Sequence, residues 1–188
     1  MKDGQWTESK EEIEVFAGGA VARQAQHQAI FSPNIHVAGA IDLLTADGLR
    51  FRSHILGLSY FDAASGQSVL IAETKDSIGE LIGNQVSYKD AFTDFGADVV
   101  FTFKKASFEQ DVILRQKPPA PEDFGLDPRT TRLEILTEFL DPPVPEKEAA
   151  KERKERVKDW TVTLSRQGPG RGRVQRLSLD GQEHARGT

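Results

Sequence analysis

The chain contains no cysteine, which excludes several kinds of site at once. Disulfide frameworks, thiolate metal sites and cysteine nucleophiles all need that residue. No apolar run approaches the roughly 18 residues of a membrane-spanning helix, so the sequence predicts no such helix. The N-terminus is polar and acidic, whereas a secretory signal combines a basic start with an apolar run. No catalytic or cofactor motif stands out.

The residues that are present divide unevenly along the 188-residue chain. Residues 146–188 hold four Lys and seven Arg against seven acidic residues, a formal charge of +4, whereas residues 1–145 carry −9. All eleven Phe and both Tyr lie in the first segment. A core needs such large apolar groups to offset the entropy lost on folding. The sequence therefore predicts a frayed segment 1–12, a folded domain 13–141 and a proline-bounded linker and tail 142–188.

Short apolar runs with a period of two, separated by turn residues, predict antiparallel β-structure within the domain. The expected strands cover residues 35–43, 49–57, 58–61, 68–72, 86–88, 99–104, 108–115 and 133–140. Asp47-Gly48 predicts a tight hairpin, because both residues readily adopt a positive φ. Residues 75–83 are more polar and are expected to form a loop or one irregular helical turn. With no long helical stretch between the strands, the pattern predicts an antiparallel β-sandwich or an open barrel.

Two further segments have distinct compositions. Residues 117–131 contain four prolines and predict an ordered surface loop, anchored by Phe124 and Leu126. Residues 146–160 are rich in helix formers and predict a short, solvated helix. From Ser165 onward the basic tail is predicted to be disordered.

Residues 13–140 resemble the β-rich N-terminal part of large, mostly uncharacterised bacterial secreted or surface proteins. The likeness is carried by HQAIFSPNIHVAGAIDLLTADG, by LRFRSHILGLSYFDAASGQSVLIAETKDSIGEL and by DAFTDFGADVVFTFKKASFEQDVILRQKPPAPEDFGL. It implies that the chain is one module of a longer, exported polypeptide. The resemblance implies no reaction and no functional residue.

Histidine is the first residue type to consider for catalysis or metal binding. His27, His36 and His54 lie in or beside the early strands, and adjacent strands could bring two of them together. No His-x-His or His-Glu-x-x-His spacing supports a metal site. Structural or surface histidines are the favoured interpretation.

Acidic residues gather between positions 73 and 98, where two carboxylates could hydrolyse a glycosidic bond or several could hold calcium. The candidates are Glu73, Asp76, Glu80, Asp90, Asp94 and Asp98. Calcium loops usually have denser oxygen donors and a positioned glycine, which this segment lacks. A solvated acidic rim at one end of the sheet is therefore favoured.

Serine and glycine motifs are weaker still. Without a Gly-x-Ser-x-Gly elbow, the serines are interpreted as strand and turn residues: Ser59, Ser65 and Ser68. Two glycine-containing segments are not followed by the lysine of a phosphate-binding loop, so their glycines indicate turns or bulges: Gly18, Gly19, Gly79 and Gly83.

The basic tail suggests one more class of partner. The segment from Gly168 to Arg173, followed by Arg176, resembles an arginine-glycine segment that contacts nucleic acid through phosphates. It contains no aromatic residue for base stacking, and the whole chain has a net charge of −5. An uninvolved solvated tail is the favoured interpretation.

Together these observations predict a non-catalytic β-sandwich module, binding or structural, within an exported or cell-surface protein. Its expected partners are neighbouring domains, with no cofactor or metal. A carbohydrate ligand would stack on exposed aromatics such as Tyr60 or Tyr88, which are equally suited to a core. The alternatives are a glycan-acting hydrolase using two of the carboxylates, and an intracellular interaction protein using the basic tail.

Overall fold

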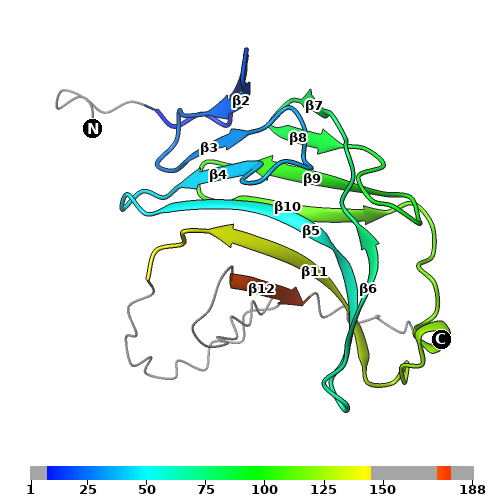
Figure 1. Ribbon diagram of the computed structural model, residues 1–188. Coiled ribbons are helices and arrows are strands. Elements are labelled where there is room, and N and C mark those ends of the chain that lie inside the picture. The colour runs from blue at the N-terminus through cyan, green and yellow to red at the C-terminus, as the bar shows by residue number, and fades with distance from the viewer. Residues whose placement is uncertain (1–7, 145–172, 179–188) are drawn as a thin grey trace, which may run out of the picture.

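The computed structural model describes residues 8–144 and, as backbone, the strand Arg173–Ser178. In these residues the chain is all-β, with two antiparallel sheets and one short 3₁₀ turn, η1 (Pro121–Phe124) (Figure 1). This confirms the predicted fold class. The expected helix at 146–160 lies outside the described residues.

The larger sheet has eight strands in the order β1-β2-β3-β4-β5-β11-β12, with β6 beside β5. Their bounds are β1 Ile13–Phe16, β2 Gly19–Ala22, β3 Gln28–Phe31, β4 Ile41–Leu44, β5 Arg50–Asp62, β6 Ser68–Glu73, β11 Thr131–Leu140 and β12 Arg173–Ser178. The long strand β5 organises this sheet, because it pairs with β4 and β6 along one edge and with β11 along the other.

The smaller sheet has four strands in the order β10-β9-β8-β7. Their bounds are β7 Gly79–Ile82, β8 Gln85–Tyr88, β9 Ala97–Phe103 and β10 Phe108–Leu114. Every residue of β9 is buried, although its alternation predicts a half-buried strand. β9 lies between β8 and β10, and on the face opposite Val99 and Phe101 the side chains of Arg115 and Gln85 reach Asp98 and Thr102.

Aromatic side chains fill the space between the two sheets. Phe31 from β3 stacks on Phe108 with ring centroids 5.9 Å apart, and Phe108 stacks on Phe101 at 5.7 Å. Tyr88 meets Phe101 edge-on at 6.1 Å. Since these rings come from both sheets, they form the centre of a β-sandwich core.

Strand β5 bends where β6 approaches it. The pairing of β5 is interrupted between Leu58 and Ser59 on the β6 side, and opposite Leu136 on the β11 side. Gly57 lies at this bend, and a Cβ there would come within 2.2 Å of the Ala72 carbonyl oxygen. Only glycine allows the two backbones to approach so closely.

Several sequence predictions are confirmed. The hairpins β4–β5, β5–β6 and β9–β10 form at the expected turns, and β11 forms at the expected position. The proline-rich connection is anchored as predicted: Leu126 is buried, and the ring of Phe124 lies 6.0 Å from that of Tyr60.

The strand expected at 35–43 begins only at Ile41. Before Ile41, hydrogen bonds to a side chain replace strand pairing. The side-chain oxygen Oδ1 of Asn34 accepts hydrogen bonds from the backbone N–H groups of His36 (3.0 Å) and Ser77 (3.2 Å). Ile35 is completely buried, so its apolar character reflects a loop that enters the core.

Residues 79–82 form strand β7, so the expectation of a loop or helical turn at 75–83 is wrong there. β7 is an edge strand whose side chains are mostly exposed, and its composition therefore lacks the alternation of a half-buried strand. The predicted disorder after Ser165 is likewise not confirmed for residues 173–178, which form β12 and pair with β11.

Truncating the central aromatic should test the position of the core. We expect Phe31→Ala to lower the free energy of unfolding by about 3–5 kcal/mol, because Phe31 is fully buried among other rings. Ile30→Ala, at the neighbouring and partly exposed position, should cost about 1 kcal/mol or less. Urea unfolding measures both, and equal losses would contradict the packing described.

The turn between β5 and β6 depends on one carboxylate. Asp62 accepts hydrogen bonds from the Ser65 hydroxyl (2.5 Å), the Thr130 hydroxyl (2.5 Å) and the Ala64 N–H (3.0 Å). These hydrogen bonds lower the pKa of Asp62 to about 2, and the one from the Ser65 hydroxyl has the largest effect. A carboxylate with a depressed pKa stabilises the fold when it is ionised.

This stabilisation should disappear in acid. It is complete above the ordinary Asp pKa of about 4 and is lost as the pH falls toward 2. We expect the free energy of unfolding of the wild type to fall more steeply between pH 5 and pH 2, roughly, than that of Asp62→Asn. Urea titrations across this range provide the measurement, and identical pH profiles would refute the role of Asp62.

Candidate functional site

The three candidate histidines lie apart from one another. The ring of His27 packs against that of Phe103, with centroids 4.6 Å apart and planes inclined by 42°, and His27 Nε2 lies 3.2 Å from the Ser107 carbonyl oxygen. His36 Nδ1 lies 3.3 Å from Asp76 Oδ1. His54 Nε2 lies 3.3 Å from Glu138 Oε2. In the described part of the chain, no group of three or more His, Asp or Glu side chains could hold a metal ion.

The candidate acids also have separate partners. Asp90 pairs with Lys75 at 2.7 Å and Glu80 with Lys89 at 2.7 Å. Asp76 accepts a hydrogen bond of 2.8 Å from Asn34. Asp94 accepts one of 2.7 Å from the Thr93 hydroxyl, and the N–H of Glu73 donates to that hydroxyl at 2.9 Å. The carboxylates of Asp76, Glu80, Asp90 and Asp94 are thus engaged by four different partner residues.

Asp98 is the one buried carboxylate of this group. Burial has the largest effect and raises its pKa, but hydrogen bonds from Arg115 and the Asp90 N–H, together with the Arg115 charge, outweigh burial. The pKa of Asp98 therefore lies below its ordinary value, and the group is an ionised structural anchor between β9 and the end of β10.

The remaining candidates have structural positions. Tyr60 and Tyr88 are buried, and their hydroxyls donate to the carbonyl oxygens of Pro119 (2.7 Å) and Ser32 (2.6 Å). The serines and glycines lie in strands β5, β6 and β7, in the β1–β2 hairpin and in turns: Ser59, Ser65, Ser68, Gly18, Gly19, Gly79 and Gly83. Gly168–Gly172 lies outside the described residues, whereas Arg173 and Arg176 belong to β12.

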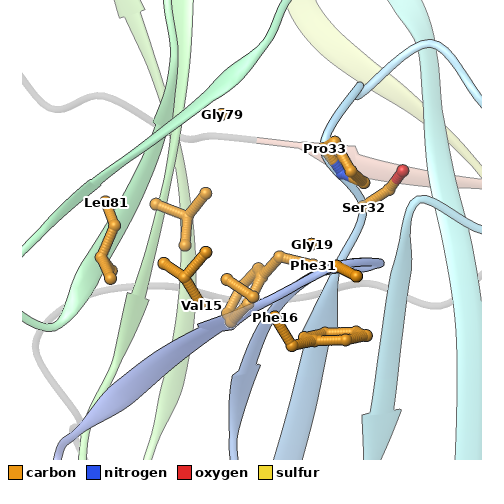
Figure 2. A pocket seen from close by; sticks show the side chains of 11 residues that line it. Val15, Phe16, Gly19, Phe31, Ser32, Pro33, Gly79 and Leu81 are labelled. Atoms are coloured by element: carbon orange, nitrogen blue, oxygen red, sulfur yellow. The ribbon is translucent and has the colours of Figure 1, made fainter.

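The structure reveals a groove that no sequence pattern indicates. It lies between the edge strands β1 and β7, has a volume of about 300 Å³, and is called the edge groove below. Its lining is Val15, Phe16, Ala17, Gly19, Ala20, Phe31, Ser32, Pro33, Gly79, Leu81 and Val86. Figure 2 shows Leu81 on one side, Val15 and Phe31 in the middle, and Ser32 and Pro33 on the other side. Only Ser32 contributes a polar side chain.

Large apolar side chains at this edge are left in solvent. Val15 is 71% exposed, Phe16 46% and Ile82 57%. Val15 and Leu81 lie on the inner faces of their sheets, as their pairing with the buried residues Ala20 and Val86 indicates. Their exposure means that the inner faces of the two sheets do not cover each other here.

The backbone at the groove is also available. In the β1–β2 and β7–β8 hairpins, the two residues that flank the two-residue turn form a hydrogen-bonded pair. Hydrogen-bonded and non-hydrogen-bonded pairs alternate along an antiparallel ladder. The next pair, Val15↔Ala20 or Leu81↔Val86, therefore directs its backbone N–H and C=O groups away from the hairpin partner. Gly79, two residues before Leu81 in β7, shows the same outward direction, because its N–H donates a hydrogen bond of 2.9 Å to the Pro33 carbonyl oxygen. Among the described residues no other segment donates a backbone hydrogen bond to Val15 or Leu81.

Comparison with known proteins adds no constraint: the chain matches no family model, no curated protein and no solved structure. No helix within the described ranges is both long and apolar enough to cross a membrane. The fold and the edge groove therefore define the chain as a β-sandwich with one open side.

Paired substitutions should show that the exposed lip of the groove does not stabilise the fold. Val15→Ser should change the free energy of unfolding by no more than about 0.5 kcal/mol. Val86→Ser, across the same groove but only 3% exposed, should cost about 2–3 kcal/mol. Urea unfolding compares the two, and a large loss for Val15→Ser would mean that this side chain is packed in solution.

Proposed function

We propose that the protein is a non-catalytic β-sandwich module of a larger exported or cell-surface protein. In this proposal the edge groove binds an extended, apolar segment of a partner polypeptide. The observation that carries the proposal is the combination of an apolar lining with outward backbone groups on both bordering strands. The exported setting is the part of the proposal that follows from the resemblance expected for residues 13–140.

The chemistry of the groove favours a strand over a small polar ligand. A polar ligand needs placed hydrogen-bonding side chains, and the lining offers only the Ser32 hydroxyl. An extended peptide satisfies its own backbone by pairing with an edge strand, and every second side chain enters the groove. The Pro33–Ile35 segment already pairs in this way with the first part of β7, through Gly79 N–H to Pro33 O and Ile35 N–H to Ser77 O.

The dispersal of the candidate acids supports the non-catalytic part of the proposal. Hydrolysis of a glycosidic bond needs two carboxyl groups facing one site, about 5–10 Å apart. The carboxylates of Asp76, Glu80, Asp90, Asp94 and Asp98 are engaged by different asparagine, lysine, hydroxyl or arginine groups, and none of the candidate acids lines the edge groove.

A peptide titration tests the groove. A labelled synthetic peptide in which Val and Thr alternate should bind the full chain, and the same peptide with Ser in place of Val should not. Val15→Arg should weaken binding by about tenfold or more, because it places a charge in the apolar groove. Fluorescence anisotropy measures the affinity.

The matched control is Ile113→Arg. Ile113 is 43% exposed on β10, well away from the groove lining, so this variant should bind the peptide like the wild type. Equal weakening by both substitutions, or equal binding of the Ser peptide, would overturn the proposed site.

A further inference from the structure

At one end of the edge groove, the chain itself occupies the edge of β7. Gly79 and Pro33 both line this end (Figure 2), and the Gly79 N–H donates to the Pro33 carbonyl oxygen at 2.9 Å. Asn34 and Ile78 form an antiparallel bridge beside them. Because Pro33 holds the position opposite Gly79, a partner strand that lies along the rest of β7 cannot continue past this point.

The chain leaves the edge of β7 at Ser32. The N–H of Ser32 donates to the Ala40 carbonyl oxygen at 2.8 Å, and Phe31 already pairs with β2 and β4 in the larger sheet. Within the described residues, no segment therefore pairs with Leu81 on its groove side. A strand bound in the groove has its end, and not its middle, beside Pro33.

Proline leaves one backbone acceptor at this end without a donor. The two residues of a hydrogen-bonded antiparallel pair exchange two bonds, but Pro33 has no N–H to give. The C=O of Gly79 points to the same side as its N–H, toward Pro33. Among the described residues, no group donates a hydrogen bond to the Gly79 carbonyl oxygen. The only polar side chain of the lining, that of Ser32, adds a hydroxyl group.

These groups suit the amino end of a polypeptide better than its carboxyl end. An α-amino group donates hydrogen bonds and is mostly positive near pH 7, whereas a carboxylate is negative and only accepts them. None of the described residues that line the groove is charged, and residues 1–145 carry a formal charge of −9. A carboxylate would meet a carbonyl oxygen and a negative domain, whereas an ammonium group meets an acceptor and an attractive field.

We propose that the edge groove binds the amino-terminal end of a partner polypeptide. The inference rests on the proposed function, in which the groove takes an extended apolar segment. The partner's α-amino group donates to the Gly79 carbonyl oxygen, and its strand runs parallel to β7. The Leu81 N–H then donates to the C=O of the partner's first residue, and the N–H of the third residue donates to the Leu81 C=O.

Recognition of the amino group fixes which side chains enter the groove. In this ladder the first residue of the partner lies beside Glu80 and the second beside Leu81. Side chains at neighbouring positions of two paired strands share a face, and successive side chains alternate between faces. Leu81 lines the groove, so Glu80 is on the other face of the sheet. The second residue of the partner should therefore be apolar, and the first need not be.

Three short peptides of equal length test the inference on the full chain, each with its dye on a carboxyl-terminal lysine. The first alternates Thr and Val and begins with Thr, so that Val is second. The second is the same peptide with an acetylated amino end. We expect the acetylated peptide to bind at least about tenfold more weakly, because it loses a charged donor and adds bulk beside Pro33. Fluorescence anisotropy measures the affinities.

The third peptide begins with Val, so that Thr is second. A peptide held only by its apolar side chains can shift by one residue and would bind as well as the first. A peptide held by its amino end cannot shift, and it places Thr in the groove. We therefore expect the third peptide to bind about tenfold more weakly than the first.

A variant of the protein tests the acceptor itself. Pro33→Ala supplies an N–H that bonds to the Gly79 carbonyl oxygen, so the preference for the free over the acetylated peptide should fall to about twofold or less. Pro128→Ala, at an exposed position of the proline-rich connection and outside the groove lining, is the matched control and should keep the full preference. Far-ultraviolet circular dichroism checks that both variants fold.

The outcomes separate this inference from the proposed function. Equal binding of the free and acetylated peptides, equal binding of the first and third peptides, or an unchanged preference in folded Pro33→Ala would each overturn recognition of the amino end. Any of these results leaves the groove as a peptide site. Failure of all three peptides to bind would overturn the proposed function and this inference together.

Discussion

The difference in width between the two sheets is the constraint on which the rest of the structure depends. With strands about 4.8 Å apart, a four-stranded sheet cannot cover an eight-stranded one. The aromatic stack of Phe31, Phe101 and Phe108 forms where the two sheets overlap. Apolar inward-facing side chains beyond that overlap have nothing to pack against, and Val15 at the β1 edge is the clearest case. The edge groove is thus a geometrical consequence of the topology.

Two buried carboxylates hold turns and strand ends in place. Asp62 and Asp98 are both buried, and each receives several hydrogen bonds in a turn or at a strand end. Such carboxylates are ionised anchors that fix where strands stop, and the hydrogen bonds that hold them also lower their pKa. The lowered pKa of Asp62 and Asp98 therefore follows from their structural contacts.

Local patterns were sufficient to predict the fold class and most hairpins. Asp47-Gly48 and the alternating stretches around it specify turns and strands from neighbouring residues alone. The prediction of strands failed where contacts with other strands determine the structure. Residues 79–82 are a strand because β8 pairs with them, although their own side chains are mostly exposed. β9 is buried on both faces, with Asp98 and Thr102 of its outer face bonded to Arg115 and Gln85 from outside the strand, and an alternating sequence does not reveal such contacts.

The candidate site could not be predicted for the same reason. Val15 and Leu81 lie far apart in the sequence, and Leu81 falls in a segment whose composition predicts a loop or a helical turn. What makes them a site is that their strands form edges on the same side of the sandwich without meeting. No spacing of residues along the sequence specifies that relation. Catalytic motifs, by contrast, are recognised by the spacing of their residues, and no such motif stands out in this sequence.

Open edges are normally a liability, because their unpaired backbone groups recruit other strands. The two ends of the larger sheet differ. At one end β12 pairs with six residues of β11 and is itself the outer strand, whereas at the other end the outer strand is β1, which has only four residues. Brevity limits accidental pairing at β1, yet the exposed Val15 and Phe16 add the apolar contacts that a specific partner would need. An edge that is too short to aggregate and still apolar enough to bind is the arrangement expected of a recognition site.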